Sequence, residues 1–125
     1  MPGELILLVE DNDNNRLLVR DVLQASGYRV VEAQNGEDGL RMAAEQRPAL
    51  ILMDIQLPGM SGIEALQRLR ADTETRAIPV IAVTASAMTQ DRRQIMAAGF
   101  DGYQAKPISV KAFLQAVREM LSPSG

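Results

Sequence analysis

The chain has 125 residues, a length typical of one domain, and 46% of them are hydrophobic, which argues against disorder. Asp and Glu together number 16 and Lys and Arg 13, and the resulting charge of −3 disfavours a nucleic-acid-binding protein, because such domains carry a basic surface. Cysteine and histidine are absent, which excludes disulfides, Ser-His-Asp triads and zinc sites using either residue, so a nucleophile must be a carboxylate, hydroxyl or amine.

Strand and helix patterns alternate along the chain. Short runs typical of strands in a parallel sheet that is covered on both faces occur at residues 5–9, 50–53 and 80–83, with a shorter one at 102–105, and a second strand is expected at 28–32. Helical patterns occur at residues 12–26, 36–46, 61–70, 88–98 and 109–121. Five strand-helix repeats predict a three-layer α/β sandwich with right-handed crossovers.

Apolar spacing predicts which face of each helix is buried. For the first helix the expected stripe is Leu18, Val22 and Ala25, with Asp13 or Asn14 as N-cap and Gly27 at the end. The stripes expected in the later helices are Leu40, Ala43 and Ala44; Ile63, Leu66 and Leu69; Ile95 and Met96; and Val110, Phe113, Leu114, Val117 and Leu121.

Polar residues follow four of the predicted strands. They are Glu10 and Asp11, Asp54, Thr84, and Lys106. Parallel strands place their carboxyl ends at one edge of the sheet, where open α/β sheets bind ligands. These side chains are therefore expected to converge in space.

Three neighbouring carboxylates raise one another's pKa unless a cation lies between them, and Mg²⁺ suits a few carboxylates with room for water and phosphate. The Lys106 ammonium group and the Thr84 hydroxyl are suited to anionic oxygens. With Asp54 as an in-line nucleophile, the set favours phosphoryl transfer.

Each residue also has an ordinary explanation. An acidic segment before a helix is commonly a capping turn, Asp54 fits a turn, Thr84 is a good strand former, and a single lysine is usually a surface charge. The joint placement of all of them at one sheet edge favours a functional site.

Four motifs carry a resemblance to a known family: VEDN at residues 9–12, MDIQLPGMSG at 53–62, VTA at 83–85 and YQAKP at 103–107. Together they resemble the receiver domains of bacterial two-component response regulators. The resemblance implies one receiver domain over residues 1–125, with a core at about 4–121 and a short polar tail at 122–125. It also implies a flavodoxin-like fold, with five helices around a five-stranded parallel sheet of order 2-1-3-4-5.

The resemblance also implies roles for single residues. Asp54 is implied as the phosphoacceptor, and Thr84 and Lys106 as the residues that contact its phosphoryl group. Mg²⁺ is the implied cofactor, and its implied ligands are Glu10, Asp11, Asp54 and the backbone carbonyl of Gln56.

Two further features of the family are implied near the end of the chain. Tyr103 is the implied switch aromatic residue, acting with Thr84, and the Lys106–Pro107 peptide bond is implied to be cis. Glu10 stands where Asp is commoner, a mild departure that leaves the metal site intact. Ala85 is small, which is expected to leave the phosphoryl group accessible.

The expected function is that of a response regulator, not an enzyme: it accepts a phosphoryl group from a sensor histidine kinase or a histidine phosphotransfer protein. Its only expected catalysis is its own phosphorylation and dephosphorylation. The signal is expected to pass to a protein target through the fourth helix, last strand and last helix, from a monomer or a phosphorylation-enhanced homodimer. The run at residues 5–9 is too short for a signal peptide or membrane span, so we expect a cytoplasmic protein that binds neither membrane nor nucleic acid.

Several alternatives remain at this point. The lack of a linker favours a stand-alone receiver over one with a DNA-binding output domain, but a receiver excised from a hybrid kinase looks the same. A haloacid-dehalogenase-like phosphatase needs a second acid two residues after its nucleophile, and Gln56 stands there instead. An unphosphorylated adaptor is expected to lack one of the acids or the lysine, and all are present.

Overall fold

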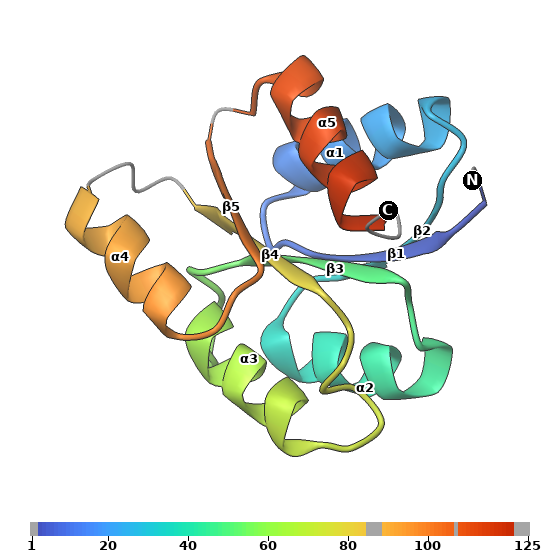
Figure 1. Ribbon diagram of the computed structural model, residues 1–125. Coiled ribbons are helices and arrows are strands. Elements are labelled where there is room, and N and C mark those ends of the chain that lie inside the picture. The colour runs from blue at the N-terminus through green and yellow to red at the C-terminus, as the bar shows by residue number, and fades with distance from the viewer. Residues whose placement is uncertain (1–2, 85–88, 107, 122–125) are drawn as a thin grey trace.

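The computed structural model describes residues 3–84, 89–106 and 108–121. Five strands are found in this part of the chain: β1 (Leu5–Val9), β2 (Arg29–Ala33), β3 (Leu50–Asp54), β4 (Val80–Thr84) and β5 (Gly102–Ala105). They form one sheet in the order β2-β1-β3-β4-β5, and every neighbouring pair is parallel (Figure 1). The predicted strand order is therefore confirmed.

A helix follows each strand. The helices are α1 (Asp13–Ala25), α2 (Gly36–Gln46), α3 (Gly62–Ala71), α4 (Thr89–Ala97) and α5 (Val110–Leu121). Helices α1 and α5 cover one face of the sheet, and α2, α3 and α4 lie on the other (Figure 1). This arrangement confirms the predicted three-layer α/β sandwich.

The sheet separates two hydrophobic cores. Side chains of a strand alternate between its faces, so Leu7 and Val9 join the core under α2 and α3, whereas Ile6 and Leu8 join the core under α1 and α5. All residues of β3 and β4 are buried. Burial on both faces explains why these strands are continuous apolar runs in the sequence.

The rotation of α1 differs from the prediction. Leu18 and Ala25 are wrongly placed in the expected stripe, because Leu18 is 50% exposed and Ala25 is exposed, whereas the partly buried Val22 does pack against the core. The buried residues of α1 are Arg16, Val19 and Leu23. Three adjacent apolar residues, at positions 17–19, are compatible with more than one buried stripe. In the structure, the stripe that faces the sheet is the one formed by Arg16, Val19 and Leu23.

The N-cap of α1 is also one residue earlier than predicted. Asn12 has an extended backbone, and its side chain accepts a hydrogen bond of 3.0 Å from the Asn15 N–H. Asp13 and Asn14, the expected caps, lie inside the helix. An Asn at this position satisfies a free N–H of the first turn, and Asp13 still supplies negative charge there.

Smaller differences occur elsewhere. Ala44 is exposed, and Met96 and Val110 are 41% and 45% exposed, so these three do not belong to buried stripes as predicted. The buried face of these helices is therefore narrower than the apolar residues in the sequence suggest. Strand β2 begins one residue later than expected, and α3 begins at Gly62 because Ser61 is its N-cap. Met88, the predicted start of the fourth helix, lies outside the described residues.

In the ranges described above, every helix is too short or too polar to cross a bilayer.

The corrected rotation of α1 can be tested with two leucines of the same helix. Leu23→Ala should lower the free energy of unfolding by about 3 kcal/mol, because it opens a cavity in a closed core. Leu18→Ala, at a half-exposed position, should lower it by less than about 1 kcal/mol. Urea unfolding followed by circular dichroism measures both values, and a larger loss for Leu18→Ala would contradict the observed rotation.

Candidate functional site

Three carboxylates lie together at the carboxyl edge of the sheet. Glu10 and Asp11 follow β1, and Asp54 ends the neighbouring strand β3. One carboxylate oxygen from each residue lies within 4.8 Å of the others. Glu10 and Asp54 are buried, whereas Asp11 is exposed.

Lys106 joins two of these carboxylates. Its Nζ lies 2.6 Å from Glu10 Oε1 and 2.9 Å from Asp54 Oδ2. The residue directly follows β5, and its backbone N–H donates a 2.8 Å hydrogen bond to the Thr84 carbonyl at the end of β4. The site is thus assembled from three strand ends, β1, β3 and β5, with β4 between the last two.

The loop after Asp54 folds back onto the strand end. The Gln56 N–H donates a 3.0 Å hydrogen bond to Asp54 Oδ1, and the Gly62 N–H donates one of 2.8 Å to the Ile55 carbonyl. A Cβ at Gly62 would lie 2.3 Å from the Asp54 carbonyl oxygen, so the start of α3 can approach this closely only with glycine. Both Asp54 oxygens therefore have fixed partners, Gln56 on one side and Lys106 on the other.

The environment of Glu10 favours its protonated form. Burial raises the pKa of Glu10 to about 7, and the nearby Asp54 carboxylate acts in the same direction, whereas hydrogen bonds from Lys106 and the Asn12 N–H oppose the rise. For Lys106, burial acts to lower the pKa, but the hydrogen bonds to Glu10 and Asp54 outweigh it and the pKa is raised. The ammonium group therefore stays charged and partly neutralises the cluster.

Thr84, Gln56 and Tyr103 are the other described residues to which the sequence assigns a role in the site or its switch. Thr84 is buried at the end of β4, and the exposed Gln56 lies two residues after Asp54. Tyr103 is half-buried on β5, and the guanidinium carbon of Arg92 lies 5.6 Å from its ring centroid. Pro107 and Ala85 lie outside the described residues, so the cis peptide and the expected access at Ala85 stay predictions.

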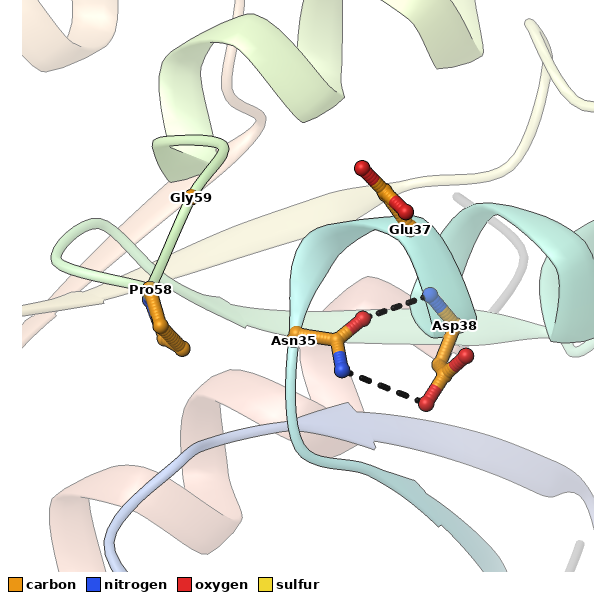
Figure 2. A pocket seen from close by; sticks show the side chains of 5 residues that line it. All are labelled: Asn35, Glu37, Asp38, Pro58 and Gly59. Atoms are coloured by element: carbon orange, nitrogen blue, oxygen red, sulfur yellow. Dashed lines mark hydrogen bonds between the residues drawn. The ribbon is translucent and has the colours of Figure 1, made fainter.

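A separate hollow of about 360 Å³ lies between the start of α2 and the loop after β3. Its lining residues are Asn35, Glu37, Asp38, Pro58 and Gly59 (Figure 2). Asn35 and Asp38 form two hydrogen bonds with each other, which cap α2 (Figure 2). Its polar groups thus serve the helix end, and its lining includes none of the three clustered carboxylates.

Three residues that shape the site have no role assigned from the sequence, although two of them, Asn12 and Gly62, stand in the quoted motifs. Asn12 caps α1 and donates its N–H to Glu10 Oε2 at 3.1 Å, Gly62 admits α3, and Arg16 donates to the Glu10 carbonyl at 3.0 Å. The glycine between Ser61 and an apolar helix was a usable signal. Nothing in the local pattern marked Arg16 as buried.

The donor set fits a hard divalent cation. Carboxylate oxygens are the ligands that Mg²⁺ prefers in proteins, and the exposed Asp11 leaves one side of the cluster open to water and to a phosphate. Two buried acids and an exposed one against a single ammonium group leave negative charge for a cation to neutralise.

Residues 6–118 match the model of the response regulator receiver domain. The chain is 48% identical over 116 residues to the polar-differentiation response regulator DivK of Brucella anthropi, with 93% of this chain and 94% of the relative covered. DivK of Brucella melitensis is 47% identical, with the same coverage. These matches confirm the resemblance drawn from the motifs.

Solved structures agree with the sequence matches. The receiver domain of a sensor histidine kinase from Pseudomonas aeruginosa has a TM-score of 0.89 at 37% identity, with 95% of this chain and 98% of that chain covered. That structure has a magnesium ion coordinated in its active site cleft. The chemotaxis response regulator CheY4 of Vibrio cholerae has a TM-score of 0.89 at 26% identity, with 95% and 99% covered.

The raised pKa of Glu10 gives a pH dependence that can be measured. Between about pH 4.5 and 7 the folded, metal-free protein holds a proton that the unfolded chain has released, so its free energy of unfolding should fall as pH rises through this window. Urea unfolding at several pH values measures the trend. Glu10→Gln should remove that contribution, and an unchanged slope in this variant would contradict the assignment.

Proposed function

The chain belongs to the response regulator receiver domain family, and on this premise we propose that Asp54 accepts a phosphoryl group from a phosphohistidine of a partner protein. The contact of Asp54 Oδ2 with Lys106 Nζ at 2.9 Å, inside the cluster formed with Glu10 and Asp11, is the observation that carries this proposal. The same ammonium group also contacts Glu10, and Asp54 is chosen as the acceptor because the motif at residues 53–62 resembles that of the family.

In the proposed reaction, a carboxylate oxygen of Asp54 attacks the phosphorus atom in line with the leaving imidazole nitrogen. The new O–P bond forms as the P–N bond breaks, and the imidazole nitrogen keeps the electron pair. Lys106, already hydrogen-bonded to Asp54, stabilises negative charge on the transferred group, and the buried Thr84 hydroxyl is the proposed donor to one of its oxygens.

Glu10, Asp11, Asp54 and the Gln56 backbone carbonyl are the proposed ligands of Mg²⁺. When bound, the ion supplies positive charge to the phosphoryl oxygens and to the acid cluster. The magnesium in the related Pseudomonas aeruginosa receiver supports this choice of metal.

The proposed activity is that of a signalling switch. A haloacid-dehalogenase-like phosphatase is disfavoured because Gln56 cannot serve as the general acid that protonates a leaving group. We propose that the chain catalyses only its own phosphorylation and dephosphorylation, in the cytoplasm, and that residues 4–121 form the receiver core. The phosphodonor is a sensor histidine kinase or a histidine phosphotransfer protein.

The proposed output surface is formed by α4, β5 and α5. Arg92 on α4 lies over the ring of Tyr103 on β5 at a cation–π distance, which connects these two elements of the surface. A phosphoryl group adds close to two negative charges at Asp54 and should draw the Thr84 hydroxyl toward it. Tyr103 then rotates inward, and the altered surface meets a protein target or a second copy of the chain.

The acceptor assignment can be tested with acetyl phosphate and Mg²⁺. Wild-type protein should gain one acid-stable, base-labile phosphoryl group, and Asp54→Asn should gain none because the nucleophilic oxygen is lost. Mass spectrometry with peptide mapping locates the group.

Asp21→Asn is the matched control, because Asp21 is an exposed carboxylate on α1 and pairs with Arg20 instead of Lys106. This variant should be phosphorylated like the wild type. A phosphoryl group found on Ser61, Thr84 or any residue other than Asp54 would contradict the assignment.

The proposed coupling between Thr84 and Tyr103 can be tested with beryllofluoride, a phosphoryl mimic. In the wild type, NMR shifts should change around Asp54 and also at the Tyr103 ring and in α4, since a bias of a few kcal/mol moves most of a two-state population. In Thr84→Ala the changes should stay near Asp54. Equal responses of Tyr103 and α4 in both proteins would show that Thr84 does not carry the signal.

A further inference from the structure

Arg16 is a charged residue in the first turn of α1, yet its side chain is only 11% exposed. Burial of a guanidinium group is unfavourable unless acceptors surround it. Three acceptors do so here. Nη1 donates to the Glu10 carbonyl at 3.0 Å, Nη2 to Asp13 Oδ1 at 2.6 Å, and Nε lies 3.3 Å from Glu32 Oε1 on β2.

The contact with Glu10 reaches the peptide group that joins the first two acids of the cluster. The carbonyl that accepts from Arg16 belongs to the Glu10–Asp11 peptide. On the other side of the same residue, the Glu10 N–H donates a 3.0 Å hydrogen bond to the Ala33 carbonyl at the end of β2. The backbone of Glu10 is therefore held at both of its polar groups just where β1 ends.

We propose that Arg16 is a positioning residue for the metal site: it fixes the Glu10–Asp11 peptide so that both carboxylates face Asp54. The inference rests on the proposed binding of Mg²⁺ by this cluster. A guanidinium group suits the role because its planar fork of donors can reach Glu10, Asp13 and Glu32 at once. The ammonium group of a lysine at this position could reach one of the three acceptors but not all of them at once.

A purely structural role for Arg16 is the alternative, in which its pairing with Glu32 only attaches α1 to β2. Arg20, one turn later on α1, separates the two roles. Its Nη1 lies 3.9 Å from Glu32 Oε2 and its Nη2 lies 3.0 Å from Asp21 Oδ1, so it pairs with Glu32 and Asp21, whereas Arg16 is the residue that donates to Glu10. Arg20→Gln is therefore the matched control for a loss of charge on the same helix beside the same glutamate.

The test compares wild type, Arg16→Gln, Arg16→Lys and Arg20→Gln in Mg²⁺ titrations followed by the amide shifts of residues 10–12 and 54. Arg16→Gln should weaken Mg²⁺ binding by about tenfold, the usual effect of removing a group that orients a metal ligand. Arg16→Lys should fall between Arg16→Gln and the wild type, and Arg20→Gln should stay within about twofold of the wild type.

A second readout needs no metal. In metal-free Arg16→Gln, the amide of Asn12, which donates to Glu10 Oε2, should exchange with solvent faster than in Arg20→Gln, because the segment it belongs to is no longer fixed. Thermal unfolding of each variant shows how far general stability has changed. If Arg16→Gln does not fold, Arg16→Lys decides by the same two measurements.

The outcomes separate this inference from the function on which it rests. Wild-type Mg²⁺ binding together with unchanged binding by Arg16→Gln, or by Arg16→Lys where that variant decides, overturns the positioning role and leaves the metal site standing. Equal weakening of Mg²⁺ binding by Arg16→Gln and Arg20→Gln overturns it as well, because the effect is then explained by the loss of a positive charge or of general stability. Absence of any Mg²⁺-dependent shift in the wild type overturns both proposals.

Discussion

A single ammonium group holds together two buried carboxylates from different strands. Glu10 and Asp54 lie buried at the ends of β1 and β3, where burial and the nearby Asp54 carboxylate raise the pKa of Glu10. Lys106 enters from β5 and contacts both. The rest of the edge is built around this bridge: Gln56 holds the second oxygen of Asp54, and Asn12 holds the second oxygen of Glu10. The two buried acids are thus held in place by groups of the protein itself.

Much of the fold could be predicted because burial on both sides leaves a strong trace in sequence. Residues of β3 and β4 are buried without exception, so their runs are continuous and end abruptly at polar residues. Strand order is different, since periodicity carries no information on which strands are neighbours, and it came from the family resemblance. The face of α1 was predicted only in part because hydropathy treats Arg16 as a surface residue, whereas its burial depends on acceptors outside the helix, Glu10 six residues earlier and Glu32 on β2.

The candidate site shows the same division. Positions at strand ends could be predicted, because parallel strands bring their carboxyl ends to one edge whatever the details of packing. The contacts that orient those side chains could not be predicted, because they depend on how closely the loops and helix ends approach one another in the folded protein. Gly62 is an example: its need for glycine follows from a carbonyl oxygen eight residues earlier, which the loop brings to 2.3 Å from where a Cβ would stand.

The bridge made by Lys106 also has a consequence for biosynthesis. Glu10 and Asp54 belong to the first half of the chain, whereas the cation that joins them is the residue directly after the last strand. A ribosome-bound chain that ends before β5 carries both acids without their ammonium partner. This edge of the sheet is therefore completed only at the end of synthesis, when β5 has docked beside β4 and Lys106 reaches both acids.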